Sequence, residues 1–469
     1  MKSVNYLSAA YKAGLASLFL TLGCCLQAQE FLVKNINYQS DTNGSNPAFF
    51  VSVGANIFYF KANDGVHGTE LWKSDGTAEG TTLVADIAAN NASADPASLV
   101  NVDGTLFFTA SDVAHGRELW KSDGTAGGTV LVSDISPGSA SSSPTNLVAV
   151  DNVLFFAANN GSAGVELWKS DGSVAGTVIV KDIFSGVGSS NPGNLTAFGT
   201  LLVFSANGST NSGAGGIELW KSDGTSEGTV PVKDINPGAA GSNPQGLTVV
   251  SNILYFSALG SSTGTELWRS DGTSAGTVLV KDLLPGSASS APQNLVNVNG
   301  TLFFAANGLG TGTNGVELWK SDGTFGGTVI VKDINVGSAS SIPRNLVNLN
   351  GTLFFTANDG ATGVELWKSD GTTTGTVLVL DINAGSAGSN PTNLVVIDNT
   401  LFFSANDNIA GNELWASDGT QAGTVLVKDL RSGPLSSSPQ GLANINGTLI
   451  FSADDGVVGR ELWKSDGTS

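Results

Sequence analysis

Glu70-Leu-Trp-Lys-Ser-Asp-Gly-Thr77 is the stretch that decides the fold, because it returns eight more times along the chain. The later copies begin at Glu118, Glu166, Glu218, Glu266, Glu317, Glu365, Glu413 and Glu461. Every tryptophan is the third residue of one copy: Trp72, Trp120, Trp168, Trp220, Trp268, Trp319, Trp367, Trp415 and Trp463. Successive tryptophans lie 48 residues apart, except for one interval of 52 and one of 51. This period predicts tandem copies of one supersecondary unit.

Each unit contains four short apolar runs, which we name a, b, c and d in chain order. In the seventh unit they are Asn345–Leu349, Thr352–Ala357, Glu365–Lys368 and Val377–Ile382. Asn350-Gly351 separates a from b, and Asp370-Gly371 separates c from d. Short runs rich in Val, Phe, Leu and Trp, bounded by such pairs, are typical of strands joined by tight hairpins. Four strands in 48 residues leave no room for a helix.

The runs Leu-Phe-Phe and Val-Leu-Val do not alternate apolar with polar residues. Strands of this kind are covered on both faces of their sheet. A four-stranded sheet cannot cover both of its own faces, but radial stacking between two neighbours does so. The sequence therefore predicts an all-β fold, a β-propeller of nine four-stranded blades.

We expect one propeller domain over residues 29–469, closed by its two ends. Phe31–Ile36 matches the d run of every unit, while the last unit stops after its c run. Pairing the two would complete the ninth blade and remove two open sheet edges. The alternative is a chain that stops inside a repeat and leaves the ring open. The blades are expected at about 47–87, 96–135, 144–183, 192–235, 244–283, 292–334, 343–382, 391–430, and 439–469 with 31–36.

Residues 1–28 have the pattern of a secretory signal peptide. Lys2 and Lys12 precede the apolar run Ala13–Leu22, and Leu26-Gln27-Ala28 offers a cleavage site. The run is too short to span a bilayer. The alternative is a lipoprotein signal acylated at Cys24. Both predict a secreted or cell-surface protein, and cleavage after Ala28 would leave no cysteine for disulfides.

The composition narrows the classes of partner. The 469 residues carry a net charge of −19, which argues against nucleic acid and anionic membranes. With 41% hydrophobic residues and only 13% charged ones, the chain has enough apolar area to fold. No later segment is long and apolar enough to predict a transmembrane span. We expect a monomer that binds a glycan or an extracellular protein.

The repeat ELWKSDGT followed by GTVLVKDI resembles the ELWxxDGT repeat family of secreted bacterial proteins. The resemblance covers nearly all of the chain after residue 28, with Ser173, Arg269 and Ala416 among the few departures. It implies an exported, propeller-like repeat array. The strand order is also similar to that of kelch propellers, although the paired glycines after strand b are absent. The family offers no established catalytic residues to transfer.

The repeated residues favour structural roles over chemical ones. Each tryptophan could be a platform for sugar stacking, but an indole present in every unit is better explained as a wedge between blades. Burying it removes about 150–250 Å² from water, worth at most ~4–6 kcal/mol. The repeated Asp-Gly could bind calcium, but it is also the chemistry of a tight turn. We expect the repeated glutamate to accept backbone N–H bonds from a neighbouring blade and the aspartate at the end of strand d to cap the turn after that strand.

The units differ most in the b–c and d–a loops, which share one face of an antiparallel propeller. Variable loops on a rigid scaffold are the usual place for binding. The b–c loops of blades four and six, 208–216 and 308–315, carry extra residues. Near the end of strand b, five contiguous blades carry an aspartate: Asp359, Asp407, Asp455, Asp64 and Asp112. The other four have Asn160, Gly208, Gly260 and Gly308.

His67 and His115 lie in the same loops as Asp64 and Asp112 and are the only histidines, so no catalytic triad or zinc cluster is predicted. We predict that this acidic sector contacts the ligand, with calcium as a possible cofactor. The alternative is that it records recent duplication. The sequence thus predicts a secreted or cell-surface scaffold that binds a glycan, a protein or a surface through the b–c and d–a loops. The alternatives are an extracellular propeller enzyme acting on glycans, a lyase or hydrolase, and a purely structural array.

Overall fold

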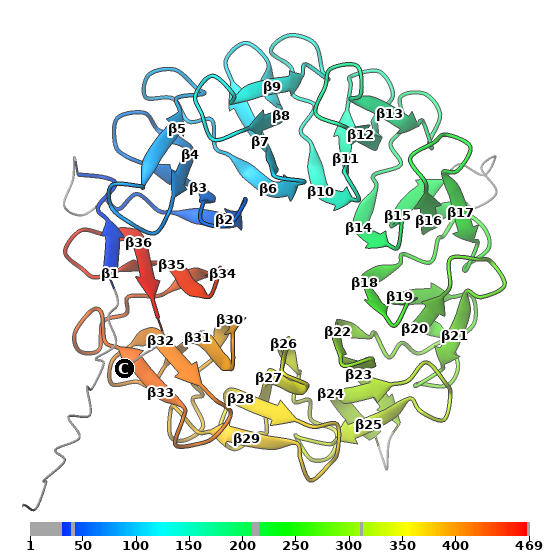
Figure 1. Ribbon diagram of the computed structural model, residues 1–469. Coiled ribbons are helices and arrows are strands. Elements are labelled where there is room, and N and C mark those ends of the chain that lie inside the picture. The colour runs from blue at the N-terminus through cyan, green and yellow to red at the C-terminus, as the bar shows by residue number, and fades with distance from the viewer. Residues whose placement is uncertain (1–30, 39–42, 209–214, 310–312, 467–469) are drawn as a thin grey trace, which may run out of the picture.

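The computed structural model describes residues 31–38, 43–208, 215–309 and 313–466 (Figure 1). The predicted signal peptide and Cys24 lie outside these residues, as do parts of the extended loops of blades four and six. The described chain forms nine four-stranded antiparallel sheets and contains no helix. It therefore offers no helix that could cross a membrane. The nine-bladed propeller predicted from the sequence is confirmed.

The sheets are arranged radially, with strand a nearest the centre and strand d at the rim (Figure 1). The a strands are β2 (Ala48–Ser52), β6 (Ala97–Val102), β10 (Thr145–Val150), β14 (Gly193–Phe198), β18 (Gln245–Val250), β22 (Gln293–Val298), β26 (Arg344–Leu349), β30 (Thr392–Ile397) and β34 (Gln440–Ile445). The b strands are β3 (Phe58–Asn63), β7 (Thr105–Asp112), β11 (Val153–Asn159), β15 (Leu201–Gly208), β19 (Ile253–Gly260), β23 (Thr301–Leu309), β27 (Thr352–Asn358), β31 (Thr400–Asn406) and β35 (Thr448–Asp454).

The two outer strands of each blade contain the repeated motif and the run that follows it. The c strands are β4 (Thr69–Ser74), β8 (Gly116–Ser122), β12 (Val165–Ser170), β16 (Gly216–Ser222), β20 (Gly264–Ser270), β24 (Thr313–Ser321), β28 (Val364–Ser369), β32 (Asn412–Ser417) and β36 (Arg460–Ser465). The d strands are β5 (Thr82–Ala85), β9 (Val130–Ser133), β13 (Val178–Lys181), β17 (Val230–Lys233), β21 (Val278–Lys281), β25 (Val329–Lys332), β29 (Val377–Leu380), β33 (Val425–Lys428) and β1 (Phe31–Lys34).

The a–b connection has the turn geometry that its sequence favours, whereas the c–d connection is longer than predicted. In the a–b turn of blade two, Asp103 and Gly104 have φ of 47° and 83°. A two-residue hairpin turn with both central residues left-handed suits the twist of the strands. In the c–d turn of blade one, Gly76 has φ of 84°, and Asp75 Oδ1 accepts bonds from the Thr77 amide at 2.8 Å and its hydroxyl at 2.7 Å. The repeated Asp-Gly therefore begins a longer c–d connection, residues 75–81, and not the tight hairpin turn that the sequence predicted.

The core consists of nine apolar clusters, and each cluster joins two neighbouring blades. Trp120 of blade two packs in one cluster with Tyr59 and Leu71 of blade one. All nine tryptophans are buried, with at most 9% of the residue exposed. They thus occupy the wedge position between blades. Lys73 adds a polar tie across the same boundary, because its Nζ donates to the Gly124 carbonyl at 2.8 Å.

The ring closes where β1 of the N-terminal segment pairs with β36 of the last blade. Leu32 lies opposite Trp463, the register that places Leu279 opposite Trp268 in blade five. Trp72 shares its cluster with Val33 and other residues of blade nine. In Figure 1, β34 lies beside β2 and β1 beside β36. The closing junction is therefore built like the others.

A substitution in β1 tests this closure against an internal standard. Val33 and Val280 are the third residues of β1 and β21 and are 5% and 6% exposed. We expect Val33→Ala and Val280→Ala to lower the free energy of unfolding by similar amounts, about 1–3 kcal/mol, in urea denaturation. If Val33→Ala leaves the midpoint unchanged while Val280→Ala lowers it, the ring is open at β1 in solution.

Candidate binding face

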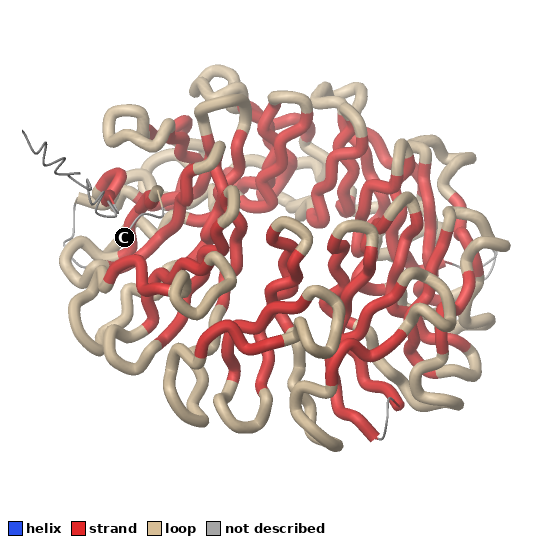
Figure 2. The backbone as a smooth tube through the Cα atoms, turned by 60° about the horizontal axis from the view of Figure 1, so that its bottom comes forward, coloured by secondary structure: helices blue, strands red, loops and turns tan. Residues whose placement is uncertain are grey.

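The b–c and d–a loops lie together on one face of the ring, which we call the loop face. In blade one, the Ser93 hydroxyl of the d–a loop accepts a bond from the Thr69 amide at the end of the b–c loop, at 2.9 Å. The same bond joins Arg117 to Ser141 and Thr265 to Ser289. The a–b and c–d turns lie at the opposite face. Figure 2 shows loops on both faces of the ring of strands.

The repeated glutamate is the polar anchor of the loop face. In blade two, Glu118 is fully buried and accepts backbone N–H bonds from Ile135 and Ser142, at 3.2 and 2.8 Å. The Ser142 hydroxyl donates to the same carboxylate at 2.5 Å. Ile135 follows strand d, and Ser142 precedes strand a of the next blade. The predicted backbone N–H bonds to the glutamate are present, but their donors lie in the d–a loop that leads to the next blade and not in that blade's strands.

Glu70 in blade one differs from the other eight glutamates. The seven carboxylates from Glu118 to Glu413 each accept a bond from a serine hydroxyl of their d–a loop. Glu461 accepts the equivalent bond from Ser45. At the corresponding place Glu70 meets Ala94, which offers only its amide at 3.0 Å. Burial raises the pKa of Glu70 to about 7, and its backbone hydrogen bonds only partly oppose this. Glu70 is the least compensated of these buried carboxyl groups.

The five aspartates of the predicted acidic sector cap their own b–c loops. Asp407 Oδ1 accepts the amides of Ile409 and Ala410 at 2.9 and 2.7 Å. Asp64, Asp359 and Asp455 accept the equivalent pair of bonds, and Asp112 accepts the amide of His115 at 2.6 Å. Asn160 of blade three makes the same contacts to Ser162 and Ala163. The structure thus gives this position a capping role, and one oxygen of each carboxylate is already engaged.

Both histidines pair with the capping aspartate of their own loop. His67 Nδ1 lies 2.7 Å from Asp64 Oδ2, and His115 Nδ1 lies 2.8 Å from Asp112 Oδ2. These contacts raise the pKa of both imidazoles. Burial opposes ionisation of Asp64, but the bonds from His67 and Val66 outweigh it and lower its pKa. Each pair is local to one loop. Within the described residues, no three His, Cys, Asp or Glu side chains are grouped so as to hold a metal ion.

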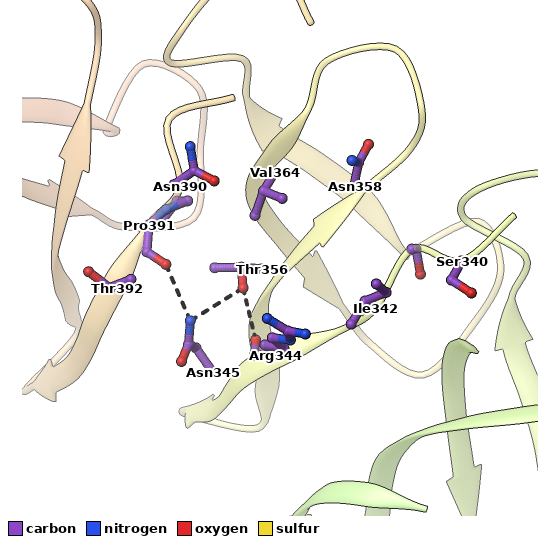
Figure 3. Close-up of a pocket in the computed structure, with 11 residues that line it drawn as sticks. Ser340, Ile342, Arg344, Asn345, Thr356, Asn358, Val364, Asn390, Pro391 and Thr392 are labelled. Carbon is purple, nitrogen blue, oxygen red and sulfur yellow. Dashed lines mark hydrogen bonds between the residues drawn. The ribbon is translucent and has the colours of Figure 1, made fainter. Parts of the chain in front are cut away.

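Between neighbouring blades, the loop face contains polar niches that the sequence analysis did not identify. The niche at blade seven has a volume of about 240 Å³. It is lined by Arg344, Thr356 and Val364, and by Asn390 and Pro391 of blade eight (Figure 3). Asn345 Nδ2 donates across it to the Pro391 carbonyl at 3.3 Å and to Thr356 Oγ1 at 3.4 Å. The residue just before each repeated glutamate lines the niche of its own blade, as Val364 and Thr265 do. The variation of this residue between repeats was the signal in the sequence that could have revealed the niches.

More of the large exposed apolar side chains lie in the loops of the loop face than in the turns of the opposite face. The b–c loops carry Val66, Val113, Ile409 and Val457, and the d–a loops carry Val187, Val336, Ile342 and Leu435. In the turns of the opposite face, Val174 and Phe325 are the large apolar side chains exposed among the described residues. The b–c group occupies blades eight, nine, one and two, four of the five blades of the predicted sector. At its b–c loop tips this sector presents aliphatic side chains, and the d–a loop between blades nine and one adds the aromatic ring of Tyr38, which is 69% exposed.

Comparison with known proteins gives partial structural alignments at low identity. No protein-family model and no curated protein matches the chain. A solved puromycin hydrolase aligns over 88% of this chain and 58% of its own, at 14% identity and a TM-score of 0.42. A prolyl endopeptidase aligns over 77% and 54%, at 10% identity and a TM-score of 0.41. A puromycin-hydrolyzing peptidase of Mycobacterium tuberculosis aligns over 76% and 57%, at 11% and 0.37. The chain spans less than two thirds of each of these proteins.

Supplying the missing hydroxyl to Glu70 should stabilise the protein in a pH-dependent way. Because the pKa of Glu70 rises from 4.5 to about 7 on folding, its contribution to stability is complete below pH 4.5 and is lost as the pH rises through 7. Ala94→Ser should lower this pKa and raise the free energy of unfolding by about 1–2 kcal/mol at pH 8, and by less at pH 4.5. Urea denaturation at the two pH values measures the difference.

Ser142→Ala at Glu118 is the matched control, and it should destabilise the protein more at pH 8 than at pH 4.5. An equal gain from Ala94→Ser at both pH values would show that the hydroxyl does not act through the carboxylate.

The acidic sector can be tested without disturbing the loops. Since Asn160 already caps its loop, changing all five aspartates to asparagine should preserve the fold, with less than about 1 kcal/mol lost per site. The sector predicted from the sequence requires that calcium affinity, measured by calorimetry at low salt, falls in this variant. Unchanged affinity would leave the carboxylates as loop caps and nothing more.

Proposed function

We propose that this chain is an exported scaffold that binds an extracellular protein through its loop face. The observation that carries the proposal is the gathering of large exposed apolar side chains in the loops of that face, where the opposite turns expose Val174 and Phe325. The face that carries more of the large exposed apolar side chains is the better candidate for protein–protein contact. The pattern of residues 1–28 and the resemblance to the ELWxxDGT repeat family support export.

A protein partner fits the loop face better than a glycan does. Sugar recognition commonly uses exposed aromatic faces, but all nine indoles are buried between blades, and in the described loops of this face Tyr38 is the exposed aromatic side chain. The side chains that do reach solvent at the b–c tips, such as Val113 and Ile409, are aliphatic. Their loops are held by aspartate caps, as at Asp407. A loop that is already ordered loses less entropy on binding, so these tips are suited to form a rigid contact surface.

Site-specific crosslinking in cells that make the protein tests the proposal. A photo-reactive amino acid is placed at Val113 or Ile409 on the loop face, and at Val174 or Phe325 on the opposite face as the matched control. All four side chains are at least 69% exposed, so the fold should tolerate the changes. We expect the loop-face positions to capture a common protein and the control positions to capture none.

Capture from the opposite face alone, or from neither face, would contradict the proposal. Binding of the purified protein to a glycan array, with no protein captured, would replace the protein partner by a glycan.

A further inference from the structure

In two blades the chain fills its own niche with a guanidinium group. Arg460, just before Glu461, donates from Nη1 to Ser452 Oγ at 3.3 Å and from Nη2 to the Ser438 carbonyl at 2.8 Å. Arg117, just before Glu118, donates from Nη1 to Thr109 Oγ1 at 3.0 Å and from Nη2 to the Asp95 carbonyl at 2.9 Å. The acceptors are equivalent in both blades: the hydroxyl of strand b opposite the first residue of strand a, and the carbonyl before the proline.

Blade five presents the same acceptors without the arginine. Thr265 stands where Arg117 and Arg460 stand, because it too precedes the repeated glutamate. Ser257 lies opposite Gln245, the first residue of strand a, and Asn243 precedes the proline. These residues line a cavity of about 490 Å³ that Pro292 and Gln293 of blade six complete. The shorter threonine leaves open the volume that an arginine side chain fills in blades two and nine.

The hydroxyl of Ser257 is a second observation that favours ligand binding in this niche. Its equivalents Thr109, Ser205, Thr356, Ser404 and Ser452 donate to the carbonyl of the first residue of strand a. Ser257 is 94% buried and lines the cavity, and its hydroxyl makes no such bond to the Gln245 carbonyl opposite it. The hydroxyl oxygen of Ser257 is therefore available to accept a bond from a donor that enters the niche, as Ser452 Oγ does from Arg460.

The remaining niches lack this combination. The niche of blade seven contains Arg344, which would repel a second cation, and its Thr356 hydroxyl is already bonded. Ser205 and Ser404 are bonded in the same way in blades four and eight. Blades three and six have Ala157 and Ala305 at this place, with no hydroxyl to offer. Blade one has Lys61 there, which points its charge toward Asp95 at 3.7 Å.

We propose that the niche between blades five and six binds the guanidinium group of an arginine side chain from the partner protein. The inference rests on the proposed function, since the niche opens on the same loop face. The net charge of −19 favours the approach of a cationic segment. No acidic side chain lines this niche, whereas Asp454 lies close to Arg460. We therefore expect weak binding of a single arginine, with a dissociation constant on the order of 1 mM.

The test uses N-acetyl-arginine methylamide as the probe, titrated into the purified protein and followed by ligand-observed NMR. Thr265→Arg should fill the niche from within, as Arg117 and Arg460 fill theirs, and weaken binding at least tenfold. Ser262→Arg is the matched control. It adds the same charge at an exposed position of the b–c loop of blade five, outside the niche lining, and should change binding less than twofold. The citrulline analogue, which keeps the shape but lacks the charge, should bind at least tenfold more weakly.

A gain-of-function variant checks the same idea independently. Arg460→Thr should create a second open niche, raise the number of bound arginine probes from one to two, and recover lost thermal stability in millimolar ethylguanidinium. Equal binding of the citrulline analogue, equal weakening by Thr265→Arg and Ser262→Arg, or no binding at all would overturn the niche assignment. If the niche assignment fails but the loop-face positions still crosslink a protein, the proposed function is retained. If the loop-face positions capture no protein either, both the proposed function and the niche assignment are contradicted.

Discussion

Every blade depends on its neighbours to cover the two faces of a small sheet. Four short strands with apolar residues on both sides cannot bury themselves, and each of the nine clusters is shared between two blades. The indole of each repeat fills that shared space, with Trp220 fully buried and Trp268 still 91% buried. Since each blade needs a neighbour on both sides, the array is most stable as a closed ring. This explains why β1 must return to β36.

The buried glutamate solves the polar half of the same problem. A chain that crosses from the rim of one blade to the centre of the next leaves backbone amides without strand partners. The carboxylate collects those amides, for example Ile183 and Ser190 on Glu166 at 2.9 and 2.8 Å. Such a group is expensive to bury unless its oxygens are bonded, and the serine hydroxyl adds the last bond in eight of the nine blades. The loops that this carboxylate anchors are also the loops of the proposed binding face.

The sequence was sufficient for the architecture because its signals are local and repeated. Asp103-Gly104 prescribes its turn, and non-alternating strands require cover on both faces. The 48-residue period places each strand without knowledge of its partners. The candidate site was harder to predict, since it depends on which side chains meet across a blade. The sequence shows that Arg460 and Thr265 are equivalent, since both precede the repeated glutamate. Their shared acceptors become visible only once the strand register sets both residues opposite the b strand and near the carbonyl that precedes the proline.

Those comparisons also show why the aspartates were a more ambiguous signal than the arginines. Asp at the end of strand b has a local use, capping its own loop, and Asn160 performs it equally well. An aspartate there can vary with the history of duplication without altering any surface. Arg117 and Arg460, in contrast, change the shape of a niche, and their replacement by Thr265 leaves a cavity lined by Ser257. In a repeat protein a departure from the consensus has functional meaning when it alters a surface that the neighbouring repeat helps to build. The niche at blade five meets that condition, because its far wall belongs to blade six.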